Sequence, residues 1–128
     1  MPKLPRPTEA EIAILGVLWK RGPSTVRQVL GDMPAGTGYT TILKLMQIMT
    51  DKKLLLRDEQ ERSHVYRAAV PESQTLRRLA GDLLDRAFGG SAQKLLVAAL
   101  SAKRATPGEL KEMRRLLDAA EKKERGSS

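Results

Sequence analysis

The sequence between residues 37 and 68 constrains the fold more than any other part of the chain. Four apolar residues recur there at i, i+3, i+4 and i+7, which is the spacing of one helix face: Ile42, Leu45, Met46 and Met49. Further apolar and aromatic residues on either side of the polar sequence DEQER favour two short strands: Leu54, Leu56, Val65 and Tyr66. The pattern predicts a helix that begins near Gly38 and is followed directly by a β-hairpin, with Tyr66 in the core beneath it.

Two helix-start sequences precede this helix. In each, a threonine is followed three residues later by Glu or Gln, the capping-box pattern in which both side chains bind backbone amides. The box at Thr8–Glu11 opens a helix whose apolar residues are Ile12, Leu15, Leu18 and Trp19. The box at Thr25–Gln28 opens a helix of about two turns, with Val26, Val29, Leu30 and Met33 inward. Three helices followed by a hairpin is the order of a winged helix-turn-helix, in which the third helix enters the major groove of DNA.

The third helix has a polar face opposite its apolar stripe. Four residues of this face suit base edges in DNA: Thr40, Thr41, Lys44 and Gln47. No acidic residue occurs from Gly38 through Thr50, as a nearby phosphate would require. Arg62, at or beside the hairpin tip, could contact phosphate. The alternative is that this polar face is simply solvated. Leu43 and Ile48 lie off the apolar stripe and either contact thymine methyl groups or widen the packing face, and we favour packing for Ile48.

After Pro71 the sequence is helical in pattern. Helix starts recur at Ser91 and at Thr106–Glu109. About 55 residues in three amphipathic helices bury too little surface to form a core alone, so we expect them to pair with a second copy. The expected dimer-interface residues are Leu76, Leu79, Leu83, Phe88, Leu95, Leu96, Leu100, Met113, Leu116 and Leu117. The alternative is that these stripes pack on residues 1–69 in a monomer.

Composition excludes several functional classes. The chain has 128 residues, no cysteine and one histidine, His64, so we expect no disulfide, no metal site and no cofactor. No nucleophile–base pair or phosphate-cradling glycine loop is evident, so we expect no enzyme. The sequence has no apolar segment long enough for a signal peptide or a membrane span, which predicts a cytoplasmic protein. The net charge of +8 favours a polyanionic partner.

Several segments, taken in order, carry a family resemblance. They are PTEAEIAILGVLW, STVRQVL, GYTTILKLMQIMTDKKLL, RSHVYRAAVP and the leucine-rich C-terminal sequence. Over essentially its whole length the chain resembles the penicillinase and methicillin-resistance repressors, winged-helix regulators of bacteria. The resemblance implies a homodimeric transcriptional repressor that holds a dyad-symmetric operator.

The resemblance also implies roles for particular residues. It makes Thr40, Thr41, Lys44 and Gln47 the groove-facing set and puts Thr25 near a phosphate. Such repressors are released when a membrane-bound sensor protease triggers cleavage in a short dimerisation helix. By position, the cleaved bond would fall near Ala98 and Ala99, where the best-known members have an Asn-Phe pair.

The sequence thus predicts a mainly α fold with a small β-hairpin: an N-terminal winged helix-turn-helix and a C-terminal helical dimerisation region. We expect a DNA-binding domain in residues 1–70, a dimerisation domain in residues 71–125 and a disordered tail in residues 126–128. The expected function is sequence-specific repression, with double-stranded operator DNA as the partner and a β-lactamase-type or other stress-response operon as the target. The alternative is a winged-helix module that binds proteins without specific DNA binding.

Overall fold

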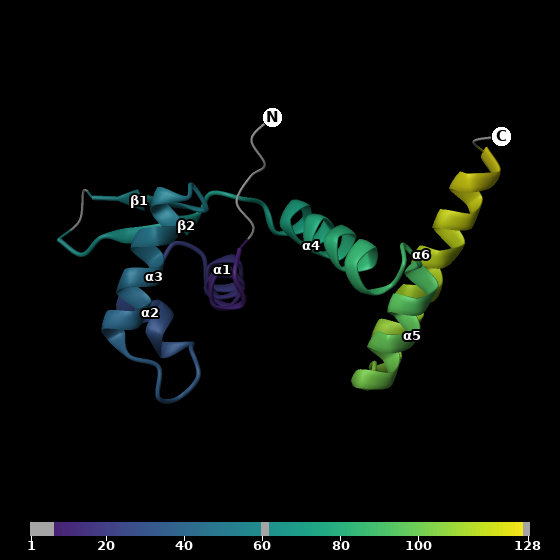
Figure 1. The fold of residues 1–128 in the computed structure, drawn as a ribbon, viewed down its shortest axis with the longest axis horizontal. Coiled ribbons are helices and arrows are strands. Elements are labelled where there is room, and N and C mark those ends of the chain that lie inside the picture. The colour runs from purple at the N-terminus through teal and green to yellow at the C-terminus, as the bar shows by residue number, and fades with distance from the viewer. Residues whose placement is uncertain (1–6, 60–61, 127–128) are drawn as a thin grey trace. The chain divides into compact units, whose positions relative to one another are not determined.

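The computed structural model describes residues 7–59 and 62–126. Across them the chain forms six helices and two strands (Figure 1): α1 (Glu9–Arg21), α2 (Val26–Gly31), α3 (Tyr39–Asp51), β1 (Leu55–Asp58), β2 (Val65–Ala68), α4 (Glu72–Ala87), α5 (Ala92–Ala102) and α6 (Pro107–Gly126). The predicted fold class, mainly α with a small hairpin that completes a winged helix-turn-helix, is confirmed. The chain divides into two units, Met1–Leu79 and Ala80–Ser128.

Both predicted capping boxes form. The Thr8 hydroxyl accepts from the Glu11 amide at 3.2 Å, and the Thr8 amide donates to the Glu11 carboxylate at 2.8 Å. The equivalent distances for Thr25 and Gln28 are 3.2 and 2.9 Å. Gly22 ends α1 with a φ of 89°, in the left-handed region that favours glycine. The beginnings and ends of α1 and α2 therefore follow from local sequence signals.

A single hydrophobic core lies in the N-terminal unit. Its buried residues are Ile14, Leu15, Leu18, Val26, Val29, Ile42, Met46, Met49, Leu54, Leu55 and Tyr66. Leu15 and Leu18 of α1 are buried as predicted, whereas Ile12 is only half-buried and Ile14, which was not predicted to face inward, is buried. The buried face of α1 also contains Glu11, which has a basic partner in Lys52. Glutamate usually lies at the protein surface, so the apolar pattern did not place Glu11 on the buried face.

The stripe of α3 packs on this core largely as predicted. Ile42, Met46 and Met49 are buried, and Leu45 is half-buried. The interpretation of Ile48 as a packing residue was wrong, because its side chain is 37% exposed. Leu43 instead packs partly against the core.

The end of α3 is a tight left-handed turn. The Leu54 amide donates to the Met49 carbonyl at 2.9 Å, and the Lys53 amide donates to the Thr50 carbonyl at 3.0 Å. This pair of bonds is a Schellman motif, and its left-handed position is occupied by Lys53, with a φ of 65°. The turn brings the chain directly from α3 into β1.

The two strands pair antiparallel, with Leu55 opposite Ala68 and Arg57 opposite Tyr66. Leu55 is the buried residue of β1, and Leu56, one of the residues that favoured this strand in the sequence, is exposed. Tyr66 is buried, as predicted. Ser24 joins β2 through two backbone bonds with Tyr66, at 2.8 and 2.9 Å. This bridge fixes the hairpin against the connection between α1 and α2.

The C-terminal helices begin where the sequence predicts. The Ser91 hydroxyl accepts from the Lys94 amide at 3.2 Å, and Thr106 forms a capping box with Glu109 at 3.0 and 3.1 Å. No described residue of α4, α5 or α6 is buried. The helix α6 continues to Gly126, the first residue of the expected tail, and residues 127–128 lie outside the described part of the chain. None of the described helices has the length and apolar content needed to cross a membrane.

Candidate nucleic-acid interface

The outer face of α3 is open and carries no acidic residue before Asp51, the last residue of the helix. Thr40, Thr41, Lys44 and Gln47 are all exposed, on the side of the helix away from its buried stripe. The first turn of α3 contains no acidic residue, and Gly38 at its N-cap supplies no side chain to bind the free amides. Because those amides carry the positive end of the helix dipole, this end of α3 favours an anionic neighbour.

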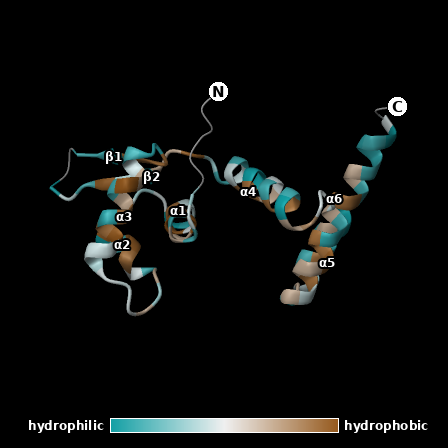
Figure 2. Cartoon of the chain, viewed as in Figure 1, coloured by the Kyte–Doolittle hydropathy of each residue, from teal (hydrophilic) through white to brown (hydrophobic). Residues whose placement is uncertain are grey.

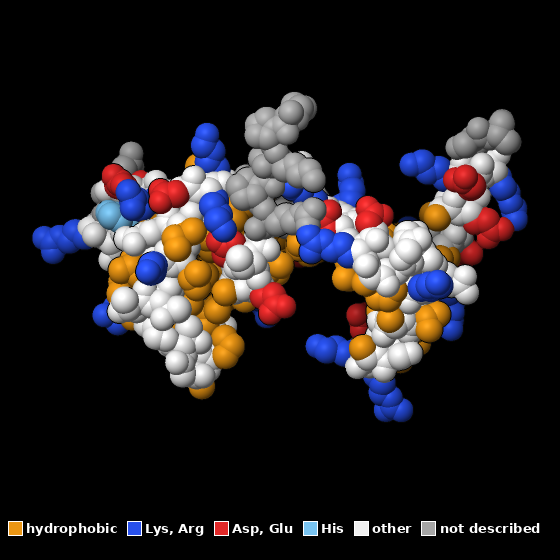
Figure 3. All heavy atoms as spheres, viewed as in Figure 1, with side chains coloured by type: hydrophobic (Ala, Val, Ile, Leu, Met, Phe, Trp, Pro, Cys, Tyr) orange, Lys and Arg blue, Asp and Glu red, His pale blue; other side chains and the backbone are white. Residues whose placement is uncertain are grey.

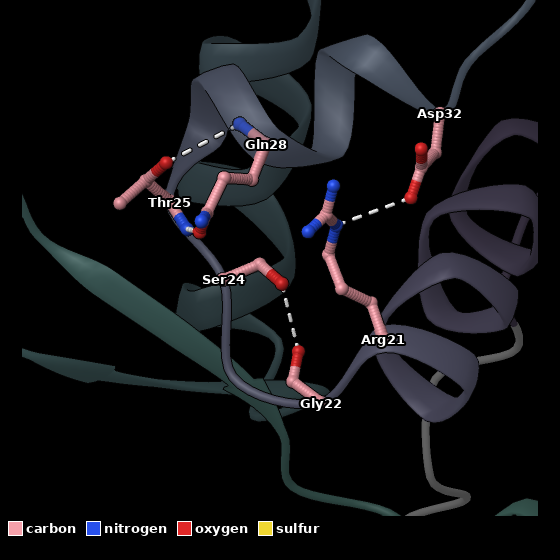
Figure 4. A network of polar contacts seen from close by, with 6 residues as sticks. All are labelled: Arg21, Gly22, Ser24, Thr25, Gln28 and Asp32. Atoms are coloured by element: carbon pink, nitrogen blue, oxygen red, sulfur yellow. Dashed lines mark hydrogen bonds and ion pairs between the residues drawn. The ribbon is translucent and has the colours of Figure 1, made fainter.

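A network of polar contacts fixes the connection between α1 and α2 (Figure 4). The Arg21 side chain, at the end of α1, donates to the Asp32 carboxylate beyond the end of α2 at 3.1 Å. The Ser24 hydroxyl donates to the Gly22 carbonyl at 2.8 Å. Thr25 is therefore held between a fixed turn and its own capping box. Its hydroxyl accepts from Gln28 and still has one O–H to donate.

A hollow of about 290 Å³ brings Thr25 and Arg62 together. We call it the wing-side hollow. It is formed by the start of α2, the start of α3 and the residues leading into β2, and its polar lining residues are Thr25, Arg27, Tyr39, Arg62, Ser63 and His64. The single histidine is exposed and appears pale blue in Figure 3. The four groove-facing candidates of α3 do not line this hollow.

Arg27 and Tyr39 form a contact that the sequence pattern does not reveal. The guanidinium carbon of Arg27 lies 5.0 Å from the centre of the Tyr39 ring. This distance is within the range of a cation–π interaction, which restrains the arginine without neutralising its charge. The two residues lie on different helices, so helical periodicity gives no signal for their contact.

Arg57 of the hairpin interacts with other residues of the hairpin. Arg57 pairs with Glu59. Hydrogen bonding to Tyr66, and then to Glu59, raises the pKa of Arg57 above its ordinary value. Its charge is therefore partly satisfied within the hairpin, whereas Arg62 lines the wing-side hollow. Residues 60 and 61, at the expected tip, lie outside the described residues.

An ion pair connects α1 to the end of α3. The Lys52 ammonium lies 3.0 Å from the buried Glu11 carboxylate. Burial raises the pKa of Glu11, but hydrogen bonds from the Thr8 amide and Lys52 outweigh this effect and hold the pKa below its ordinary value. This pair was not predicted, because the residues are distant in sequence. It helps to fix α3 on the body of the unit.

The expected dimer-interface residues remain accessible. Five of them are exposed: Leu76, Leu83, Leu100, Leu116 and Leu117. The other five are half-buried: Leu79, Phe88, Leu95, Leu96 and Met113. Hydrophobic bands alternate with hydrophilic ones along α4 and α6 (Figure 2), and hydrophobic side chains reach the surface of the C-terminal unit (Figure 3). Ala98 and Ala99 both lie on α5 and are exposed.

The chemistry of the groups around α3 suits binding. Within the described ranges, no group of His, Cys, Asp and Glu could hold a metal ion. The polar residues gathered around α3 are hydroxyl, amide and cationic groups, which can donate hydrogen bonds to base edges and phosphates.

The chain is similar to known proteins in sequence and in fold. The family model described as penicillinase repressor matches residues 7–119. The transcriptional regulator BlaI of Mycobacterium tuberculosis is 35% identical over 101 residues, which cover 76% of this chain and 73% of the relative, in each of two strains. A solution structure of monomeric BlaI from Bacillus licheniformis, in complex with the blaP half-operator, aligns with a TM-score of 0.48 and 24% identity. That alignment covers 57% of this chain and 92% of the other.

The family match spans both units of the chain. It begins just before α1 and ends within α6. The chain therefore belongs to the penicillinase repressor family of transcriptional regulators.

Proposed function

We propose that the chain is a sequence-specific DNA-binding repressor that acts as a homodimer on a dyad-symmetric operator. The observation that carries the proposal is the exposed face of α3, which is polar, has no acidic side chain from Tyr39 to Thr50 and lies opposite a buried stripe. A helix held in this way can enter a major groove without exposing its apolar side. Its anchoring residues Ile42, Met46 and Met49 keep that face fixed on the core.

The residues of this face suit particular base edges. Lys44 can donate to guanine and Gln47 can bind adenine with two hydrogen bonds, while a threonine methyl can contact the methyl group of thymine. Thr40 and Thr41 supply such methyl groups one turn nearer the start of α3. Thr25 and Arg62, which line the wing-side hollow, would bind the phosphate backbone and set the register of α3.

The homodimer is supported by the accessible leucines of the C-terminal helices. Leu116 and Leu117 of α6 are 53% and 56% exposed, and Leu76 and Leu83 of α4 are also exposed. Burying a leucine fully is worth about 1.5–3 kcal/mol, so a second copy would gain free energy by covering them. Two-fold pairing would present two α3 helices to two half-sites.

The wider regulatory role extends the same proposal. Relatives in the family are named as penicillinase repressors and as BlaI transcriptional regulators, which supports a β-lactamase-type or other stress-response operon as the target. Release by a membrane-bound sensor protease system would involve cleavage near Ala98 and Ala99. Their exposure on α5 supports access to that bond.

The test of the proposal is an operator-binding titration with Lys44→Ala. The DNA would be the fragment upstream of the chain's own gene, with a random-sequence duplex as competitor. Losing one base contact should cost about 1–3 kcal/mol, which is roughly 5- to 150-fold in affinity. Lys20→Ala removes an exposed lysine from α1 and is the matched control. If Lys44→Ala binds as tightly as the unmodified chain, the assignment of α3 fails.

The alternative is a winged-helix module that binds a protein. Its support is the acidic character of the hairpin, where Glu59 already pairs with Arg57. It predicts that the upstream fragment and the random-sequence duplex bind equally weakly at near-physiological salt. A preference for the upstream fragment would exclude this alternative.

A further inference from the structure

The wing-side hollow has a cationic lining that the groove-facing residues do not explain. Among the residues that the structure describes, nine line it, and these include Arg27 and Arg62 and no aspartate or glutamate. Thr25, Tyr39, Ser63 and His64 add groups that can donate hydrogen bonds. The composition of the hollow therefore favours an anion with several acceptor oxygens.

Arg27 is restrained for such a role. Its guanidinium group lies over the Tyr39 ring, 5.0 Å from the ring centre. A stacked arginine loses less conformational freedom on binding than a free one, and its planar group can still donate to an oxyanion. Within the part of the chain that the structure describes, Arg27 forms no ion pair, so its charge remains available.

The position of the hollow beside α3 indicates which anion it would bind. Tyr39 and Leu43 of α3 line the hollow. Each is followed directly by a residue that we propose to face the groove, Thr40 and Lys44. A helix in the major groove is flanked by the two phosphate backbones. We propose that Arg27, held by Tyr39, binds a backbone phosphate of DNA in the wing-side hollow, together with Thr25 and Arg62. This inference rests on the proposed function and adds Arg27 and Tyr39 to its binding residues.

A salt titration separates a phosphate contact from base reading. The full chain and Arg27→Gln would be titrated with the upstream fragment and with a random-sequence duplex at several salt concentrations. Each lost phosphate contact should lower the slope of log affinity against log salt by about one. We expect Arg27→Gln to weaken binding to both duplexes by about tenfold and to leave their ratio unchanged. Lys44→Ala should instead reduce the ratio.

Three further measurements sharpen the test. Lys20→Gln removes the same charge from α1 and should retain the slope of the unmodified chain. Arg27→Lys keeps the charge without the planar stack, so it should restore the slope while recovering the affinity in part. Circular dichroism melts should be the same for all variants, because Arg27 is exposed.

Calorimetry with inorganic phosphate, in the absence of DNA, distinguishes a DNA phosphate from a free anion. We expect no saturable binding. Saturable binding that Arg27→Gln abolishes would assign the hollow to a free anion and overturn the inference. An Arg27→Gln variant with an unchanged slope would also overturn it. If the unmodified chain does not prefer the upstream fragment, the proposed function fails, and the slope on random duplex still tests Arg27.

Discussion

The helices α3 and α6 have similar apolar stripes, but the stripe of α3 is buried and that of α6 is exposed. In α3, Met46 and Met49 are fully buried beneath α1, α2 and the hairpin. In α6, Leu116 and Leu117 are more than half exposed, and no described residue of α5 or α6 is buried. An apolar stripe at helical spacing therefore favours burial of that helix face. Whether the same chain buries it depends on the elements that pack against it.

The largest expected effect comes from placing charge on the uncovered stripes. The double variant Leu83→Asp, Leu116→Asp should be monomeric in sedimentation, because burying two carboxylates in an interface is costly. Operator affinity should fall by about 10²–10⁴-fold, since the second half-site is no longer reached intramolecularly. Lys122→Asp puts an acid on the opposite side of α6 and should stay dimeric. A dimeric double variant would show that these leucines are not the interface.

The next largest effect is the difference in unfolding free energy between alanine substitutions on the stripes of α3 and α6. Met46→Ala should lower the free energy of unfolding of the N-terminal unit by about 2–5 kcal/mol, because it leaves a cavity in a packed core. Leu117→Ala should change that free energy by less than about 0.5 kcal/mol, as for other surface substitutions. Urea unfolding followed by Trp19 fluorescence measures both. Equal losses would mean that the two helices are covered within the same chain.

The N-terminal unit also contains the buried carboxylate of Glu11, whose basic partner Lys52 can be removed by substitution. Lys52→Met leaves Glu11 without its ammonium partner and should destabilise the unit by about 1–2 kcal/mol at pH 7, because Lys52 is partly exposed. The pKa of Glu11 is lowered by folding, so its contribution is complete above the ordinary value of 4.5 and is lost as the pH falls through the folded value.

The effect of Lys52→Met should therefore shrink in acid. Unfolding titrations between neutral and acidic pH measure this change, and Lys20→Met on the same helix as Glu11 serves as the control. A difference between Lys52→Met and the unmodified chain that stays constant with pH would contradict the proposed role of the pair.

The smallest expected effect is a stabilisation. Lys53 adopts a φ of 65° in the turn after α3, a conformation that costs a non-glycine residue about 1 kcal/mol. Lys53→Gly should therefore raise the free energy of unfolding by about 0.5–1 kcal/mol, as measured in urea. Lys53→Ala should give no such gain. A destabilised glycine variant would indicate that the lysine side chain contributes more than its backbone strain costs.

Local signals made much of the N-terminal unit predictable. Capping boxes at Thr8 and Thr25 and the stripe from Ile42 to Met49 define three helices, and turn chemistry ends them. The errors came from single residues whose burial depends on distant partners. Glu11 is buried and paired with Lys52, and Ile14 is buried on the inward face where Ile12 was predicted. Ile48 is exposed, while Leu43 packs against the core instead.

The candidate site was predictable only in part. The exposed face of α3 follows from helical geometry, because a residue opposite a buried stripe must point away from the core. The wing-side hollow does not follow from it. Arg27 and Tyr39 lie on separate helices, and Thr25 and Arg62 are far apart in the sequence, so no periodic pattern connects them.

The sequence by itself determined the order of the elements, their caps and the polar face of α3, because these depend on residues within a few positions of one another. Tertiary structure alone decided the Glu11–Lys52 pair, the Ser24 bridge to Tyr66 and the stacking of Arg27 on Tyr39. The physical reason is that such contacts form only after helices and strands have packed, when groups far apart in the chain meet at hydrogen-bonding distance.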